Sequence, residues 1–157
     1  MFRFAVHKMR PFVLYLLPVI VWMVLIFGFS GDGASFQHSS RIIGPLVRWL
    51  FPGMSPAGVN DIVFAARKGA HLSEYAVLAL LVWRARRKWP LPGRHPSYWP
   101  AAMVALWVAV FYAATDEFHQ TFVPTREGCL RDVLIDSSGA VAGLCVLWLL
   151  GRWRKAW

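Results

Sequence analysis

The amino-acid sequence predicts an all-α fold: a polytopic membrane protein with four transmembrane helices plus a short interfacial helix in its first outer loop. Three observations favour this fold class. The chain of 157 residues is 57% hydrophobic and contains nine Trp, which is more apolar than an ordinary soluble domain. Its apolar residues gather in four stretches of about the length that a spanning helix needs, roughly 20 residues. Its 17 Lys and Arg lie largely in short runs beside those stretches.

The net charge of +9 does not indicate a nucleic-acid-binding protein. Such proteins gather their bases on a recognition element with interleaved polar residues, whereas here the bases flank apolar segments. The length indicates a single membrane domain over residues 1–157. We therefore expect membrane lipids, and not nucleic acid, among the partners of this protein.

The first spanning helix is expected at about residues 11–29, a run without charge. This run is longer than the apolar core of a signal peptide, about 7 to 15 residues, and no clear cleavage site follows it. Pro18 predicts a kink or a local irregularity within the helix. A short amphipathic segment at 41–50 is interrupted by Gly44 and Pro45, which predicts a broken helix in the membrane interface.

The second spanning helix is expected at about 62–83, capped by Asn60 or Asp61. Its first turns carry charged and imidazole side chains before an uninterrupted apolar run. We therefore expect this helix to begin in a polar cavity or at the interface and to end in lipid. The third span is expected at about 98–115, where it meets a group of acids.

The fourth spanning helix is expected at about 133–150. It contains Gly139 and Gly143, which stand four residues apart on one side of the helix. Small residues at this spacing allow another helix to pack closely in a membrane. The pair therefore predicts a helix-packing face and not a functional group.

The distribution of bases predicts the orientation. Eleven of the 17 Lys and Arg lie in the N-terminus, in the loop after the second span and in the C-terminus, while all eight Asp and Glu lie on the other side. Cytoplasmic segments carry the excess of Lys and Arg. We therefore expect both termini in the cytoplasm and the acidic segments outside.

Polar residues concentrate at the predicted outer ends of the second, third and fourth spans. Ionisable groups at such positions are costly unless they are paired, bound to metal or facing water, so they are functional candidates. The spacings of Lys68, His71 and Tyr75, and of Asp132 and Asp136, place each set on one face of its helix. We expect these helix ends to form one outward-facing pocket, with the N-termini of the second and fourth helices suited to an anion.

The candidate catalytic residues are Asp116, Glu117, His119 and His71, and the candidate ligand-binding residues are Lys68, Glu74, Tyr75, Gln120, Arg126, Asp132 and Asp136. Simpler interpretations remain open for some of them. Lys68 could pair with Glu74 along the helix, and Asp132 could serve only as a helix cap. His71 and His119 could ligate a metal together with an acid, but no established metal-binding spacing supports this. The sequence identifies neither a metal nor another cofactor.

Three segments carry a resemblance to a known family: IFGFSGDGASFQHSS, KGAHLSEYAVLAL and DEFHQTFVPTREGCLRDVLIDSSGAVAG. In order and spacing they resemble the motifs of the VanZ-like membrane proteins over nearly the whole chain. Thr125 stands where that family usually has a glycine, and Asp136 where it usually has an asparagine. The resemblance implies a four-helix protein of the bacterial cytoplasmic (inner) membrane, related to an accessory factor of teicoplanin resistance. It also implies the candidate site residues named above.

These observations favour a cell-envelope protein whose polar pocket binds an anionic lipid, a lipid-linked precursor headgroup or a lipophilic glycopeptide. The alternative is an intramembrane enzyme that acts on such a lipid. In that case Asp116 or Glu117 would serve as general base, His119 or His71 as acid or metal ligand, and Arg126 as phosphate clamp. An ion-coupled transporter is less well supported, because the inner halves of the predicted spans lack ionisable groups.

Overall fold

The computed structural model describes residues 11–31, 36–88, 97–124 and 128–155. Within these ranges the chain is helical apart from short connections and contains no strand, so the prediction of an all-α fold is confirmed. The elements are a π-helical turn, η1 (Phe12–Leu16), and the helices α2 (Leu17–Ser30), α3 (Phe36–Leu50), α4 (Pro56–Lys88), α5 (Tyr98–Gln120) and α6 (Leu130–Trp153).

Three helical segments in the described part are long and apolar enough to cross a membrane: Phe12–Ser30, Tyr98–Gln120 and Leu130–Trp153. They correspond to the first, third and fourth predicted spans. The segment predicted as the second span lies in α4, which is not among the three. Charged side chains toward both ends of α4 interrupt its apolar sequence.

The start of the first span is irregular, as Pro18 predicted. The π-helical turn η1 immediately precedes α2, and Pro18 lies in the first turn of α2. Proline has no N–H, so the carbonyl four residues earlier lacks its usual helical partner. The π-helix is rare and occurs mostly as a single turn within an α-helix, and here it precedes the helix that contains the proline.

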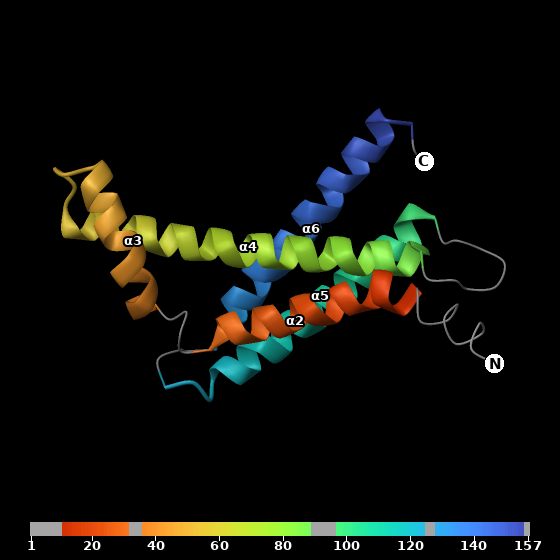
Figure 1. Ribbon diagram of the computed structural model, residues 1–157, viewed down its shortest axis with the longest axis horizontal. Coiled ribbons are helices and arrows are strands. Elements are labelled where there is room, and N and C mark those ends of the chain that lie inside the picture. Colours follow the sequence, from red (N-terminus) through yellow and green to blue (C-terminus); the bar gives the residue numbers. More distant parts are fainter. Residues whose placement is uncertain (1–10, 32–35, 89–96, 125–127, 156–157) are drawn as a thin grey trace.

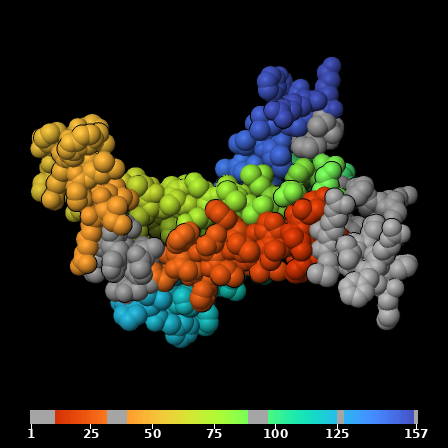
Figure 2. Space-filling model, in the orientation of Figure 1, coloured from red at the N-terminus to blue at the C-terminus, as the bar shows by residue number. Residues whose placement is uncertain are grey.

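Helix α4 is the central helix of the bundle (Figure 1). It packs against α2, α5 and α6, while its N-terminal part extends past them and carries α3 (Figures 1 and 2). Its 33 residues give a length of about 50 Å at 1.5 Å per residue. The predicted cap at Asn60 or Asp61 is wrong, because the helix begins at Pro56 and both side chains are exposed on its surface. Proline is well suited to the first turn of a helix.

Helix α3 is continuous, so the prediction of a broken helix is wrong. Its 15 residues include Gly44 and Pro45, and proline costs the helix one main-chain hydrogen bond. Packing against α4 offsets this cost, because Val47 is buried together with Val59 and Val63 of α4. The contact fixes α3 on the part of α4 that extends past the other helices.

Small residues allow α4, α5 and α6 to approach closely. On α6, an added Cβ at Gly139 would lie 2.3 Å from the carbonyl oxygen of Leu72, and one at Gly143 would lie 3.0 Å from the Cβ of Ala76. The predicted packing face of α6 is therefore confirmed. Helix α5 has a comparable face, which was not predicted from the sequence, formed by buried alanines four residues apart: Ala101, Ala105, Ala109 and Ala113.

Side chains from α2 and α5 donate hydrogen bonds to main-chain carbonyl oxygens of neighbouring helices. Trp22 Nε1 donates to the carbonyl oxygen of Glu74 in α4 at 2.9 Å. The hydroxyl of Tyr112 in α5 donates to the carbonyl oxygen of Met23 in α2 at 2.5 Å. Such bonds between membrane helices contribute about 0.6 kcal/mol each on average and fix the rotation of one helix against the next.

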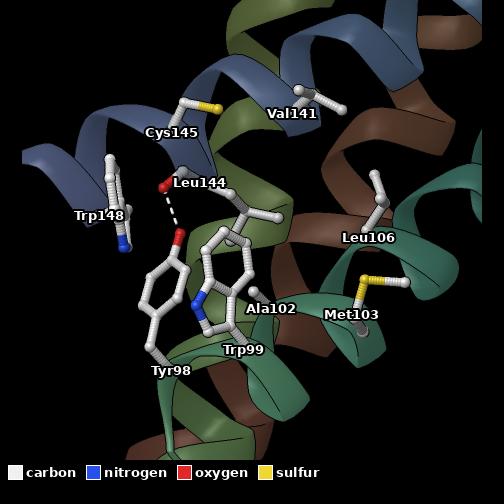
Figure 3. A pocket seen from close by; sticks show the side chains of 9 residues that line it. All are labelled: Tyr98, Trp99, Ala102, Met103, Leu106, Val141, Leu144, Cys145 and Trp148. Atoms are coloured by element: carbon white, nitrogen blue, oxygen red, sulfur yellow. Dashed lines mark hydrogen bonds between the residues drawn. The ribbon is translucent and has the colours of Figure 1, made fainter.

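A similar hydrogen bond joins α5 to α6 at the opposite end of the bundle from the acids. The Tyr98 hydroxyl donates to the carbonyl oxygen of Leu144 beside a small apolar pocket of 130 Å³ (Figure 3). Trp99 and Trp148 line the same pocket, with their ring centroids 6.1 Å apart. These aromatic contacts attach the start of α5 to the C-terminal half of α6.

Candidate functional site

The acidic motif forms the last turn of α5. The third span was predicted to end at residue 115, but α5 continues to Gln120. Asp116, Glu117 and Gln120 are all buried, with exposed fractions of 2%, 5% and 3%. Glu117 follows Ala113 by four residues and so continues the alanine face. The side of α5 that packs into the bundle therefore ends in two carboxylates and an amide.

These two carboxylates share a hydrogen-bond donor. Gln120 Nε2 lies 3.2 Å from Asp116 Oδ2 and 3.2 Å from Glu117 Oε1. The other oxygen of Glu117, Oε2, accepts a hydrogen bond from the main-chain N–H of Cys129 at 2.9 Å. Gly128 permits this approach, because an added Cβ there would lie 2.4 Å from the carbonyl oxygen of Glu117. The residue types of Gly128 and Cys129 do not predict this role, since a main-chain donor leaves no signature in side-chain chemistry.

Helix α6 contributes two carboxylates, one at its start and one a turn deeper. Asp132 is not the helix cap, because Cys129 occupies that position. Asp132 Oδ1 instead lies 2.6 Å from Lys68 Nζ of α4, so the alternative pairing of Lys68 with Glu74 is wrong. The side chains of this pair are 23% and 28% exposed, whereas Asp136 is only 1% exposed. The ion pair therefore forms the rim of the site and Asp136 its interior.

Two side chains of α4 lie near Asp136: the imidazole of His71 and the phenol of Tyr75. His71 Nδ1 lies 3.6 Å from Asp136 Oδ1 and 3.9 Å from Glu74 Oε2. Tyr75 is completely buried and lies within electrostatic range of the carboxylates of Asp116 and Asp136. Side chains from α4, α5 and α6 thus converge, as the spacing of polar residues predicted. We call this group the polar site: Lys68, His71, Glu74, Tyr75, Asp116, Glu117, Gln120, Asp132 and Asp136.

The polar site includes buried atoms that have no hydrogen-bond partner in the described part of the chain. Among them are the hydroxyl of Tyr75 and Oδ2 of Asp136. Buried polar groups in proteins are nearly always hydrogen-bonded, and leaving one unsatisfied costs about 1–3 kcal/mol. Tyr75 and Asp136 therefore offer a donor and an acceptor that a polar group from outside the described chain would satisfy.

The polar site is rich in carboxylates, which it draws from three helices: Glu74, Asp116, Glu117, Asp132 and Asp136. Asp136 lies within electrostatic range of Glu117, Asp116 and Asp132 as well as of Lys68. Like charges this close disfavour one another, whereas protons, cationic groups and hydrogen-bond donors stabilise them. The interior of the polar site therefore favours donor groups of a ligand, and its rim offers the cation of Lys68.

One predicted site residue of the described ranges, His119, is not brought into this arrangement. The ring of His119 packs against Phe27 of α2, with centroids 4.2 Å apart, while His71 faces Asp136. Arg126 lies outside the described residues. In the ranges that the structure describes, no three His, Cys, Asp or Glu side chains are grouped so that they could hold a metal ion.

A protein-family model described as VanZ/LLP1 matches residues 12–151. The chain belongs to the VanZ/LLP1 family. This match covers η1 and α2 to α5 in full and α6 up to Gly151, and it confirms the resemblance carried by the sequence motifs. With three helices of membrane-crossing length, the chain is a VanZ-like membrane protein. No curated protein and no solved structure matches it significantly.

Proposed function

We propose that this VanZ/LLP1 protein crosses the bacterial cytoplasmic membrane four times, with α4 as the additional span and both termini in the cytoplasm. Helix α4 packs against α2, α5 and α6, and its Lys68 and His71 side chains face Asp132 and Asp136 of α6 rather than lipid. Lys68 and Arg86 stand 18 residues apart in α4. This separation is about 27 Å along the helix axis, close to the roughly 30 Å thickness of the hydrocarbon core.

In this arrangement α3 lies at the outer membrane surface. Its side away from α4 carries exposed apolar residues, Ile42, Leu46 and Trp49. Their spacing of four and three residues places them on one face of the helix. An apolar face of this kind suits a helix lying in the interface between headgroups and acyl chains.

In this proposal the polar site binds the polar part of an amphiphilic ligand in the cell envelope. The ligand is an anionic lipid, a lipid-linked precursor or a lipophilic glycopeptide. The observation that carries the proposal is the pair of unsatisfied buried atoms, the Tyr75 hydroxyl and Asp136 Oδ2. A hydroxyl or amine of the headgroup would donate to Asp136, and an oxygen of the headgroup would accept from Tyr75.

The rim of the site supports recognition of an anion on the same ligand. Lys68 is held by Asp132 but remains 23% exposed, so a phosphate or carboxylate approaching from outside could displace Asp132. An ammonium group pairs with phosphate as a compact charge. Arg126 follows the polar end of α5 in sequence and is a second candidate for this anion.

Native mass spectrometry of the full-length protein, released in mild detergent with bound envelope lipid, tests the proposal. Tyr75→Phe removes one hydroxyl from the polar site, and Tyr98→Phe makes the same change at the opposite end of the bundle. We expect Tyr75→Phe and Asp136→Ala to lower lipid occupancy about tenfold, the effect of one lost hydrogen bond, and Tyr98→Phe to retain it. Unchanged occupancy in both polar-site variants would overturn the proposal.

A second candidate function is an intramembrane enzyme acting on an envelope lipid. It is favoured by the position of His71, whose Nδ1 lies 3.6 Å from Asp136 Oδ1 and beside Glu74. A histidine oriented by carboxylates can transfer protons during hydrolysis or group transfer. Incubating the purified protein with isolated envelope lipids should then give a new product by mass spectrometry, and His71→Ala should not. Absence of any product with added divalent metals would exclude this candidate.

The connection to glycopeptide resistance follows from the family and is part of the proposal. A bacterial strain that produces this protein should survive higher teicoplanin concentrations than the same strain producing Tyr75→Phe. Equal susceptibility of the two strains, at equal protein levels in the membrane, would separate the polar site from resistance.

A further inference from the structure

An apolar groove of 570 Å³ runs along the bundle at the end opposite the polar site. Helices α2, α4 and α5 form it together with η1, and the apolar residues lining it include Leu16, Met23, Val82 and Val108. One charged residue, Arg86, also lines the groove. From Leu16 to Met23 the groove follows two turns of helix, a distance of about 10 Å.

The guanidinium of Arg86 differs from those of its neighbours on α4. Arg84 stacks on Tyr15, with its guanidinium carbon 5.3 Å from the ring centroid, and Arg87 stacks on Trp83 at 5.0 Å. Arg86 Nη1 is buried and has no hydrogen-bond partner in the described part of the chain. A buried guanidinium nitrogen without a partner is costly, more so than a neutral group.

The sequence offers no carboxylate side chain near this position. The preceding acid, Glu74, is twelve residues earlier in α4, and the next one along the chain, Asp116, is at the far end of α5. The segments 1–10 and 89–96, which adjoin η1 and α4 in sequence, contain no Asp or Glu. No Asp or Glu side chain of the chain is therefore placed by the sequence to pair with Arg86, and an anionic ligand would supply the missing partner.

We propose that this groove is a binding site for an anionic phospholipid. One acyl chain lies along the apolar walls formed by α2, α4 and α5, and the phosphate pairs with Arg86. A planar guanidinium matches phosphate with two parallel hydrogen bonds. Basic pockets between membrane helices are a recurrent form of binding site for anionic headgroups. The apolar lining and the unneutralised cation together select a molecule with both features.

This site is independent of the headgroup proposed for the polar site. Arg86 and Lys68 lie about 27 Å apart on α4, so one headgroup cannot occupy both. A variant at Arg86 therefore tests the groove without changing any residue of the polar site.

The experiment compares phosphatidylglycerol with phosphatidylcholine of the same acyl chains. Full-length protein is delipidated in mild detergent, titrated with each lipid and analysed by native mass spectrometry. We expect the wild-type protein to hold one phosphatidylglycerol in preference to phosphatidylcholine. Arg86→Gln should reduce this preference about tenfold, because it removes charge-assisted hydrogen bonds. Arg84→Gln is the matched control and should retain the preference, since Arg84 stacks on Tyr15.

A second variant keeps the test independent of the stability of Arg86→Gln. Val104 lines the groove and is 40% exposed, so Val104→Phe narrows the groove while leaving Arg86 in place. It should also lose the bound phosphatidylglycerol while keeping the helical circular dichroism of the wild type. Equal binding of the two lipids by the wild type, or unchanged preference in Arg86→Gln and Val104→Phe, would overturn the inference.

Discussion

Gly139 of α6 lies directly against the main chain of Leu72 in α4. A Cβ added at Gly139 would come within 2.3 Å of the Leu72 carbonyl oxygen and 2.8 Å of its Cα. Leu72 follows His71, and Gly139 lies three residues after Asp136 in the same helix. The approach of the two main chains therefore sets the 3.6 Å separation between His71 Nδ1 and Asp136 Oδ1.

Replacing Gly139 with alanine should separate α4 from α6. The new methyl group would overlap main-chain atoms that cannot move independently, so we expect a loss of about 1–3 kcal/mol in stability. Gly143→Ala is the comparison, because its Cβ would meet Ala76 at 3.0 Å and requires a smaller adjustment. Thermal unfolding in detergent should show a lower midpoint for Gly139→Ala than for Gly143→Ala. Equal midpoints would contradict the close approach at Leu72.

Variants of the rim ion pair should change headgroup binding in opposite directions. Asp132→Ala releases Lys68 from its 2.6 Å pairing and makes its charge available to an anionic headgroup, so binding should become tighter. Lys68→Ala removes that charge, so binding should become weaker. Titration of each protein with an anionic envelope lipid in nanodiscs measures both changes. A partly exposed pair contributes up to about 1 kcal/mol to stability, so both variants should remain folded. Weaker binding in Asp132→Ala would show that Asp132 itself contacts the ligand.

Glu117→Ala should loosen the connection between α5 and α6. It removes the oxygen that accepts the main-chain N–H of Cys129 at 2.9 Å. We expect faster hydrogen exchange at the amide of Cys129, measured by mass spectrometry on a peptide that contains the start of α6. Asp132→Ala is the control, because it changes a residue in the same peptide but keeps Glu117. It should leave the Cys129 amide protected from hydrogen exchange. Unchanged exchange in Glu117→Ala would mean that another group supports this turn.

The native cysteines provide a test of the proposed orientation. Cys129 is exposed at the polar end of the bundle. In a Cys145→Ser background, a membrane-impermeant maleimide added to spheroplasts should label Cys129 without permeabilisation. Labelling that requires lysis would place the polar site on the cytoplasmic side and reverse the orientation.

The sequence predicts the convergence of three helix ends well, because it depends on a regular property of helices. Lys68, His71 and Tyr75 share one face of α4, so any bundle that buries this face brings them together. The helix boundaries were less accurate, because they depend on local capping and on packing between distant segments. Helix α4 begins earlier than predicted, at Pro56, and Cys129 replaces Asp132 as the cap of α6.

The position of His119 shows a limit of spacing arguments. Residues four apart lie about 40° from each other around a helix and residues three apart about 60° in the other direction. Gln120 and His119 therefore lie on opposite sides of Asp116. Gln120 turns inward to the carboxylates, and His119 turns toward Phe27. The spacing predicts that Asp116, His119 and Gln120 lie near one face of α5. It does not predict that His119 contacts Phe27 of α2 while Gln120 lies in the polar site.

The interhelical hydrogen bonds made by Tyr112 and Tyr98 depend on the amino-acid type at the donor residue but not at the acceptor residue. Their acceptors are the main-chain oxygens of Met23 and Leu144, which every amino acid supplies. A substitution at Met23 or Leu144 that fits the surrounding side chains therefore preserves the bond. At the donor positions only a side chain that places an O–H or N–H at the same point preserves the bond. Substitution is therefore more restricted at the two tyrosines than at the residues that accept their hydrogen bonds.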